Sequence, residues 1–257
     1  MCIMKRLIKK TLNRFGYDVV SYVPPEESQF KAVRDLPDHE REILARVKPF
    51  TMTSIESVAS LINAVSYITK NKIEGDVAEC GVWRGGSMMT VALTLLAHND
   101  TSRELFLYDT FEGMTEPSPV DTRFDGVPAK SEMEQQQGKW CYASIEDVRE
   151  NILSTGYPEK KIHLVLGKVE ETIPQVLPTK LSLLRLDTDW YESTKHELVH
   201  LSPLLSPDAV LIIDDYGHWQ GSRKAVDEYF AEQNRKVYLH RIDYSGRVAV
   251  GINKFAN

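Results

Sequence analysis

The feature that most constrains the fold of this chain is an alternation of short apolar runs with segments of helical apolar spacing. The apolar runs cover residues 77–80, 105–109, 162–167, 181–187 and 209–215. Continuously apolar strands that alternate with helices are typical of a parallel sheet covered on both faces. We therefore expect an α/β fold with a doubly wound, mostly parallel sheet.

The end of the chain departs from this alternation. Residues 236–243 and 247–253 flank the turn Tyr244-Ser245-Gly246, which indicates a β-hairpin. The hairpin would add two antiparallel strands at one edge and bring the predicted sheet to seven strands. In an open sheet of this kind ligands bind at the carboxyl ends of the strands, so the residues that follow the apolar runs are the first candidates for a site.

Two of the apolar runs end in pairs of carboxylates. Asp187 and Asp189 end one run, and Asp214 and Asp215 end the next. Like charges at neighbouring strand ends raise one another's pKa, so a cation is needed to neutralise them. Oxygen ligands without a nearby Cys or His favour Mg²⁺, with Mn²⁺ or Ca²⁺ as alternatives. The pattern predicts a divalent metal that also holds two substrate oxygens.

The same segment contains the candidates for a general base. Asp189 is the first candidate and Asp187 the second, because both follow one strand and lie two residues apart on an extended segment. His218 is close in sequence to the second pair and is the third candidate. The division of roles among these residues stays open at the level of sequence.

A glycine-rich turn, ECGVWRGGS at residues 79–87, follows the first apolar run. Its spacing is neither of the usual phosphate-binding glycine patterns. Glu79 would repel a phosphate but would suit an amine or a sulfonium. Asp109 ends the second run, where nucleoside-binding sheets hold a ribose diol. These features favour a nucleoside cofactor without phosphates, and S-adenosylmethionine fits.

Four ordered segments of the chain read VAECGVWRGGS, YDTFEGM, LLRLDTDWYEST and IIDDYGHWQGSRKAVDEYF. They resemble the macrocin O-methyltransferase family, whose members methylate sugar hydroxyls with S-adenosylmethionine and a divalent metal, and the resemblance spans roughly residues 45–255. It implies a class I methyltransferase with a Rossmann-like sheet. It also implies an O-methyltransferase that acts on a sugar of an antibiotic or a surface glycan, and a homo-oligomer.

The resemblance implies a role for each matching position. The methionine part of the cofactor would be surrounded by Glu79, Gly81, Val82, Trp83 and Ser87, and its carboxylate would be reached by Thr51, Met52 and Thr53. The ribose would be held by Asp109 and Thr110, and the adenine by Ser144, Gly167 and Lys168. The metal ligands would be Asp187, Asp214 and Asp215.

Two segments lie outside this core pattern. Residues 1–44 are expected to form an N-terminal extension, and residues 45–257 the methyltransferase domain. Residues 1–16 predict a basic amphipathic helix that either contacts an anionic membrane surface or packs on protein. Residues 111–142 form a long polar insertion, expected to be a lid over the acceptor, with a surface loop as the alternative. Trp140 and Tyr142 of the insertion would stack on a sugar face.

Composition excludes several other classes. The net charge of −6 argues against a nucleic-acid partner. Three cysteines at long spacings indicate neither a disulfide framework nor a zinc site, so we expect a cytoplasmic protein, with membrane association as the open alternative. No apolar run reaches the roughly 18–20 residues that span a bilayer.

Two further functions explain part of the pattern. The segment LRLDTD resembles the nucleophile motif of haloacid-dehalogenase-type phosphatases, but most of the predicted sheet precedes it and the second acidic pair follows early. The other alternative is a non-catalytic scaffold that binds a nucleoside. The complete set of four aspartates argues against a scaffold, because an unreactive protein has no need of them.

Overall fold

The computed structural model describes residues 9–17, 33–136 and 140–253. The chain separates into two units, Met1–Arg34 and Asp35–Asn257. In the first unit residues 9–13 are helical, whereas residues 1–8 of the expected basic helix lie outside the described residues. None of the described helices is both long and apolar enough to cross a membrane.

The second unit is built on a seven-stranded sheet with the order β3-β2-β1-β4-β5-β7-β6. Its strands are β1 (Asp76–Cys80), β2 (Leu105–Asp109), β3 (Ile162–Leu166), β4 (Leu181–Leu186), β5 (Leu205–Ile213), β6 (His240–Arg241) and β7 (Arg247–Val250). Strands β1 to β5 are parallel, and β7 is antiparallel to both β5 and β6. This confirms the predicted sheet and its C-terminal hairpin.

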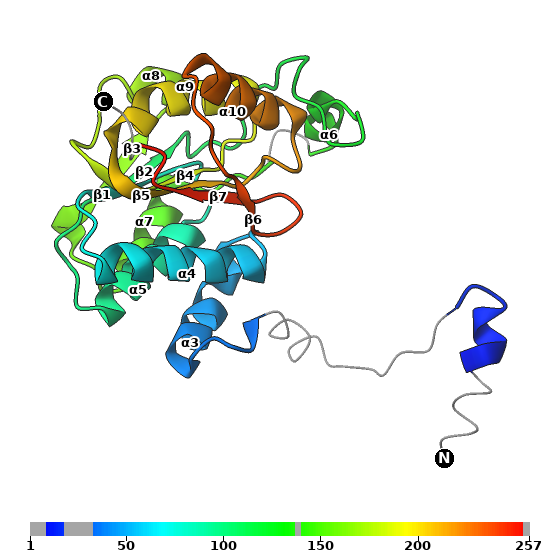
Figure 1. Cartoon of the computed structure of the whole chain (residues 1–257), viewed down its shortest axis with the longest axis horizontal. Helices are drawn as coiled ribbons and strands as arrows, with labels where there is room; N and C mark the ends of the chain where they lie inside the picture. The colour runs from blue at the N-terminus through cyan, green and yellow to red at the C-terminus, as the bar shows by residue number, and fades with distance from the viewer. Residues whose placement is uncertain (1–8, 18–32, 137–139, 254–257) are drawn as a thin grey trace. The chain divides into compact units, whose positions relative to one another are not determined.

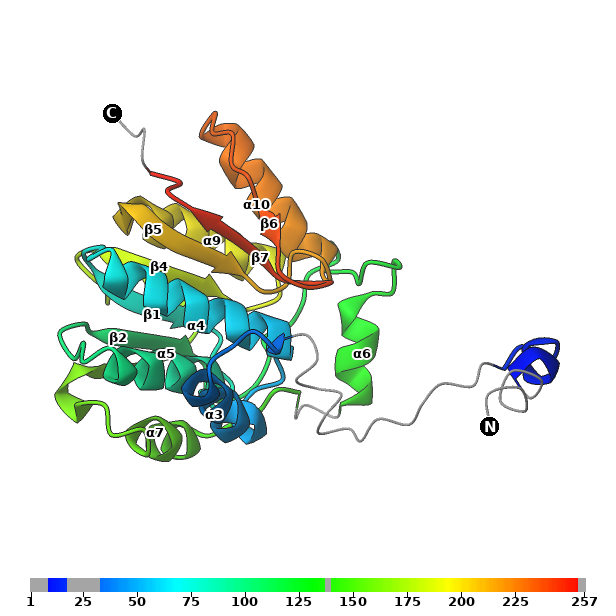
Figure 2. The same cartoon turned by 60° about the horizontal axis from the view of Figure 1, so that its bottom comes forward.

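Helices cover both faces of the sheet (Figures 1 and 2). One face carries α4 (Ile55–Lys70), α5 (Gly86–Ala97) and α7 (Ile145–Leu153), with α3 (Asp38–Val47) packed on α4 and α5. The other carries α8 (Val169–Thr172), α9 (Tyr191–Leu201) and α10 (Gln220–Glu232). The short helices η2 (Lys48–Phe50), η3 (Glu159–Lys161) and η4 (Ser202–Leu204) join elements. Every residue of the central strand β4 is buried, because helices lie on both sides of it.

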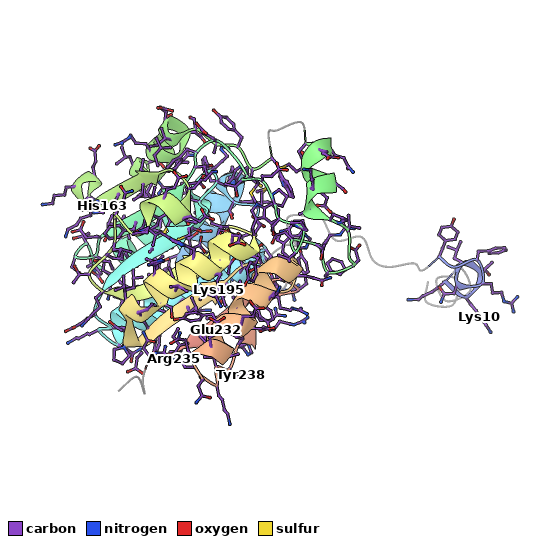
Figure 3. The ribbon with its side chains drawn as sticks, turned by 90° about the horizontal axis from the view of Figure 1, so that it is seen from above. Lys10, His163, Lys195, Glu232, Arg235 and Tyr238 are labelled. Atoms are coloured by element: carbon purple, nitrogen blue, oxygen red, sulfur yellow. The ribbon has the colours of Figure 1, made fainter. Side chains whose placement is uncertain are left out.

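The helices on the second face are linked to each other as well as to the sheet. Lys195 of α9 and Glu232 of α10 form an ion pair of 2.7 Å on the outer side of the two helices (Figure 3). The pair is partly exposed, so it contributes little compared with the apolar residues beneath it. Leu198, Leu201, Val226 and Phe230 pack from these helices into the main apolar core.

The polar segment 111–142 contains a helix that the sequence did not predict, α6 (Ala129–Gln135). The segment is fastened by Asp121, whose carboxylate accepts hydrogen bonds from the Ser118 N–H and hydroxyl and from the Tyr191 N–H at the start of α9. Two backbone hydrogen bonds of 2.8 Å also join residues 122–124 to residues 218–220 after β5. These contacts hold the segment at the carboxyl ends of β4 and β5.

The strand register brings the ends of β1, β4 and β5 to one level. Cys80 pairs with Leu186, and Leu186 pairs with Ile213. The pairing continues one residue further, because the Asp187 N–H donates to the Cys80 carbonyl and the Asp214 N–H to the Leu186 carbonyl, each at 2.9 Å. The strand order reverses between β1 and β4, and such a switch point is where sheets of this kind bind ligands.

Candidate functional site

A cavity of about 510 Å³ opens at the carboxyl ends of these strands. Most of the predicted site residues line it, namely Thr51, Met52, Thr53, Gly81, Val82, Trp83, Ser87, Asp109, Thr110, Gly167, Lys168, Asp187, Asp189, Asp214 and Asp215. Two predicted cofactor residues do not. Glu79 is buried within β1, and Ser144 caps α7 by accepting a hydrogen bond from the Asp147 N–H.

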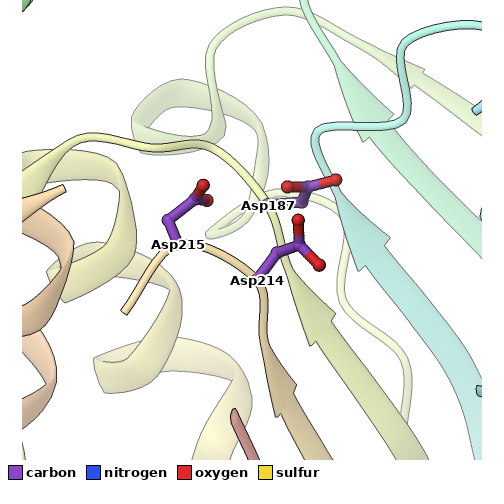
Figure 4. Close-up of side chains that lie close together, drawn as sticks. All are labelled: Asp187, Asp214 and Asp215. Carbon is purple, nitrogen blue, oxygen red and sulfur yellow. The ribbon is translucent and has the colours of Figure 1, made fainter. Parts of the chain in front are cut away.

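Three carboxylates meet in the cavity wall (Figure 4). Asp187 extends from the end of β4, and Asp214 and Asp215 extend from the end of β5. One carboxylate oxygen from each lies within 4.8 Å of the others. Three oxygen donors at this spacing suit a hard divalent cation such as Mg²⁺. The structure thus brings the three predicted metal ligands together.

The same proximity is costly for the charged forms of these carboxylates. Burial raises the pKa of Asp187 and of Asp215 well above the ordinary value for aspartate, and the neighbouring negative charges raise both further. Arg185 lowers both pKa values in part. A bound divalent cation would relieve the remaining repulsion.

Arg185 is the residue of this site that the sequence reasoning missed. Its side chain is 3% exposed, and Nη1 lies 2.5 Å from both Glu79 Oε1 and Asp187 Oδ2. Nη2 donates to Asp214 Oδ1 at 2.7 Å and to Thr53 Oγ1 at 3.0 Å. The expectation that a metal alone neutralises the acids was therefore incomplete. The signal was present as one arginine within an otherwise apolar run, since a buried arginine requires partners.

Glu79 retains one free acceptor. It is 1% exposed, and its Oε2 atom has no hydrogen-bond partner among the described residues. Burial raises the pKa of Glu79 to about 7, although the Arg185 charge and hydrogen bond lower it. An unpartnered buried acceptor costs about 1–3 kcal/mol. The position therefore fits a donor that a ligand supplies.

Asp189 differs from the three clustered carboxylates. Its φ of 68° lies in the left-handed region, and its Oδ1 accepts a hydrogen bond of 2.7 Å from Trp219 Nε1. Its own N–H donates to Asp215 Oδ2 at 3.3 Å. Burial and the charge of Asp187 raise the pKa of Asp189 to about 7. A carboxylate that titrates near neutrality is suited to act as a general base.

His218, the third candidate base, also lines the cavity. Its Nδ1 lies 3.2 Å from the Tyr244 hydroxyl, and its ring centroid lies 4.6 Å from that of Trp219. Burial lowers the pKa of His218, so the neutral ring is favoured near pH 7. The ring thus belongs to an aromatic wall of the cavity.

That wall is centred on three tryptophans. The rings of Trp140, Trp190 and Trp219 pack edge to face with centroids 5.1–5.9 Å apart. Trp140 and Trp219 line the cavity, whereas Trp190 lies behind them and donates to the Thr115 carbonyl at 2.9 Å. Tyr142, the other expected stacking residue, is 54% exposed and does not line the cavity.

The glycine turn is shaped by the chain itself. A Cβ on Gly81, whose φ is +79°, would lie 2.0 Å from the Asp187 carbonyl oxygen, and a Cβ on Gly86 would lie 2.5 Å from the Phe50 carbonyl oxygen. Close approach of a ligand is therefore not the only reason for glycine at these positions. They first allow neighbouring backbone to approach, which places the end of β4 against the turn after β1.

Asp109 braces this turn. Its Oδ2 accepts hydrogen bonds from the Val82 N–H at 2.7 Å and the Trp83 N–H at 3.2 Å, and its Oδ1 accepts one from the Phe111 N–H at 2.7 Å. Burial raises the pKa of Asp109 although these hydrogen bonds lower it. The residue expected to hold a ribose thus also holds the backbone around the cavity.

The chain matches the family described as Macrocin-O-methyltransferase (TylF) over residues 3–249. This match begins well before residue 45, so the expectation that the N-terminal segment lies outside the family resemblance was wrong. The match includes every one of the predicted site residues.

Individual proteins agree with this match. The chain is 32% identical over 213 residues to the 8-demethyl-8-(2,3-dimethoxy-alpha-L-rhamnosyl)-tetracenomycin-C 4'-O-methyltransferase of Streptomyces olivaceus, covering 82% of this chain and 80% of that protein. It is 28% identical over 243 residues to the mycinamicin III 3''-O-methyltransferase of Micromonospora griseorubida, covering 93% and 92%. The solved structure of the O-methyltransferase NovP has a TM-score of 0.70 and 29% identity, covering 78% of this chain and 81% of that one.

Proposed function

This chain belongs to the macrocin O-methyltransferase family, and from that premise we propose that it transfers the methyl group of S-adenosylmethionine to a sugar hydroxyl of a glycoside. The observation that carries the proposal is one cavity lined by both the glycine turn after β1 and the carboxylates Asp187, Asp214 and Asp215. Cofactor and acceptor would then meet between the two, close to Asp189.

The residues of the wall divide the chemistry between them. Asp187, Asp214 and Asp215 would hold Mg²⁺ or another divalent cation, which supplies a Lewis acid for two adjacent hydroxyls. Asp189 would take the proton of the reacting hydroxyl, with Asp187 as the second candidate. The deprotonated oxygen would then take the methyl group as its bond to sulfur breaks, and S-adenosylhomocysteine would be the product. Holding the two reactants in line would supply much of the rate.

The cofactor would lie along the turn after β1. Glu79 does not itself line the cavity, but its carboxylate lies beside the lining residue Ser87, and its unpartnered Oε2 suits the cofactor's ammonium group. The Thr51–Thr53 segment would reach the carboxylate. Asp109 accepts three backbone hydrogen bonds and a long one of 3.5 Å from the Thr110 hydroxyl, and a ribose hydroxyl would take the position of this long contact.

The first test is cofactor binding. S-adenosylhomocysteine should bind with micromolar affinity in isothermal titration calorimetry, and Glu79→Gln should weaken binding about 10-fold or more, because a hydrogen bond between charged groups is lost. Glu74→Gln is the matched control, since Glu74 is exposed and pairs with Lys180 instead. If the wild-type protein binds no S-adenosylhomocysteine, the proposed function is wrong.

The charge of the cavity favours an uncharged acceptor. Among the described residues the wall carries one lysine, Lys168, and eight carboxylates, namely Asp109, Glu132, Glu170, Asp187, Asp189, Asp214, Asp215 and Asp243. The described cations of the 111–142 segment are already paired, Arg123 with Asp125 and Glu132, and Lys130 with Glu116. Even with a divalent cation on Asp187, Asp214 and Asp215, carboxylates outnumber positive charges in the wall, so a phosphorylated acceptor would be repelled. Trp140 and Trp219 offer apolar faces to a neutral sugar ring.

The second test compares two acceptors that carry the same sugar. Methyl α-L-rhamnopyranoside should be methylated with a kcat/KM at least about 10-fold above that of a nucleoside-diphosphate rhamnose, and added salt should narrow the difference because it screens the repulsion. Mass spectrometry of the methylated products gives both values. A preference for the nucleotide sugar would contradict the proposed acceptor class and leave methyl transfer itself intact.

A further inference from the structure

The proposed metal ligands have a second positive partner inside the protein. We propose that Arg185 is an internal counter-ion that competes with the divalent cation for Asp187 and Asp214, so that the acidic site stays folded without metal and binds metal weakly and reversibly. This inference rests on the metal site of the proposed function. It concerns a residue that is not among those lining the cavity.

Arg185 lies between the predicted metal ligands and the predicted cofactor-binding residues. It lies in β4 with Glu79 of β1 beside it in the sheet register, and its side chain is 3% exposed. The planar guanidinium can donate in two directions at once. Nη1 is shared between Glu79 and Asp187, and Nη2 between Asp214 and Thr53, at 2.5–3.0 Å. Each nitrogen therefore contacts one predicted metal ligand and one predicted cofactor-binding residue, Glu79 or Thr53.

The charge of Arg185 explains how the acidic site can stay folded without metal. Five carboxylates gather here, Glu79, Asp187, Asp189, Asp214 and Asp215. Among the described residues Arg185 forms ion pairs with three of them, Glu79, Asp187 and Asp214. Removing one partner of a buried ion pair leaves an uncompensated charge and is strongly destabilising. Without Arg185 the acids would have to be neutralised by a metal or by protons.

The same contacts set a limit on metal affinity. A divalent cation needs oxygen atoms of Asp187 and Asp214, and both carboxylates already accept from Arg185, whereas Asp215 has no contact with it. The guanidinium also repels a second cation at short range. Loss of its charge should therefore free two ligands and tighten metal binding, while making the fold depend on the metal.

The test uses Arg185→Gln in the full-length protein, with Mn²⁺ as the probe. Titration calorimetry should give a Mn²⁺ affinity at least 10-fold tighter than in the wild-type protein. Differential scanning fluorimetry should show a lower Tm in EDTA and a larger rise of Tm on adding Mn²⁺. Arg185→Lys keeps the positive charge but loses the planar guanidinium. Its Mn²⁺ affinity should therefore lie between those of the wild-type protein and Arg185→Gln.

Arg103→Gln is the matched control. Arg103 is also buried, at 8% exposure, and it forms an ion pair with Asp100. Its other partners, the carbonyl oxygens of Ile73 and Gly75 and the Ser182 hydroxyl, lie at the other end of the sheet from the carboxylates. Its loss should lower the Tm equally in EDTA and in Mn²⁺. A metal-dependent rescue seen only for Arg185→Gln separates charge competition from general loss of packing.

The remaining outcomes each decide the question. An unchanged or weaker Mn²⁺ affinity in Arg185→Gln, or a variant that stays unfolded at saturating Mn²⁺, would overturn the inference. If the wild-type protein binds no Mn²⁺, or Asp214→Asn binds it equally well, the proposed metal site fails instead. If Asp214→Asn abolishes Mn²⁺ binding but Arg185→Gln does not bind Mn²⁺ more tightly than the wild-type protein, the metal site is supported. Only the competition by Arg185 is then rejected.

Discussion

Asp189→Asn is expected to lower kcat about 10²–10⁴-fold while the affinities for S-adenosylhomocysteine and Mn²⁺ stay close to wild type. This range is the usual contribution of a positioned general base. Asparagine tolerates the left-handed φ of 68° at this position, and its carbonyl oxygen can still accept from Trp219 Nε1. The substitution therefore removes the proton acceptor and little else. Steady-state kinetics with methyl α-L-rhamnopyranoside and titration calorimetry measure both quantities.

Trp219→Phe provides the comparison for Asp189. It removes the hydrogen bond of 2.7 Å to Asp189 Oδ1 but leaves the carboxylate in place, so the expected loss of kcat is smaller, about 10-fold. Retention of kcat within a few-fold in Asp189→Asn would show that another group takes the proton. His218→Gln would then be the next variant to measure, because Asp187→Asn would remove a metal ligand at the same time.

Asp214→Asn should abolish metal-dependent turnover without weakening cofactor binding. The substitution removes one negative charge from the three carboxylates whose oxygens lie within 4.8 Å of one another. The asparagine oxygen can still accept from Arg185 Nη2, which preserves the contact of 2.7 Å that joins β4 to the end of β5. Mn²⁺ titration of the chelated enzyme should restore activity in the wild-type protein and not in the variant.

Asp214→Asn changes both a predicted metal ligand and a partner of Arg185, and Asp215→Asn separates these two effects. Asp215 is a predicted metal ligand without an ion pair to Arg185, so its variant loses a charged ligand and leaves the arginine network unchanged. The asparagine oxygen can still accept from the Asp189 N–H. Equal losses of turnover in the two variants would assign the effect to the metal. If EDTA leaves methyl transfer to the acceptor intact, the metal role is wrong for both.

The family match favours methyl transfer over the two alternative functions. A phosphotransferase would not explain the glycine turn after β1, and the match to an O-methyltransferase family covers residues 3–249. A scaffold would not require Asp189 beside the three clustered carboxylates. Homo-oligomer formation and contact of residues 1–16 with a membrane stay predictions, and part of that segment lies outside the described residues.

The polar insertion shows where local pattern reading fails. Residues 111–142 have no apolar period, yet they contain α6 and supply Trp140 to the cavity wall. Their order comes from Asp121, which bonds Ser118 and the start of α9, and from backbone pairing with residues 218–220. Apart from Ser118, these partners are distant in sequence, so no local rule reveals them. The Tyr142 ring, expected beside Trp140, lies outside the cavity because the backbone turns between them at Cys141, whose φ is 51°.

The sequence by itself determined the class of fold and the edge at which the site lies. Apolar runs that end in Asp109, Asp187 and Asp214 can be read without coordinates, because a parallel sheet brings the carboxyl ends of its strands to one side. Only the tertiary structure decided how the charges are balanced. The register of β1, β4 and β5 places Arg185 among Glu79, Asp187 and Asp214, and pairing between strands is set by packing of the whole sheet.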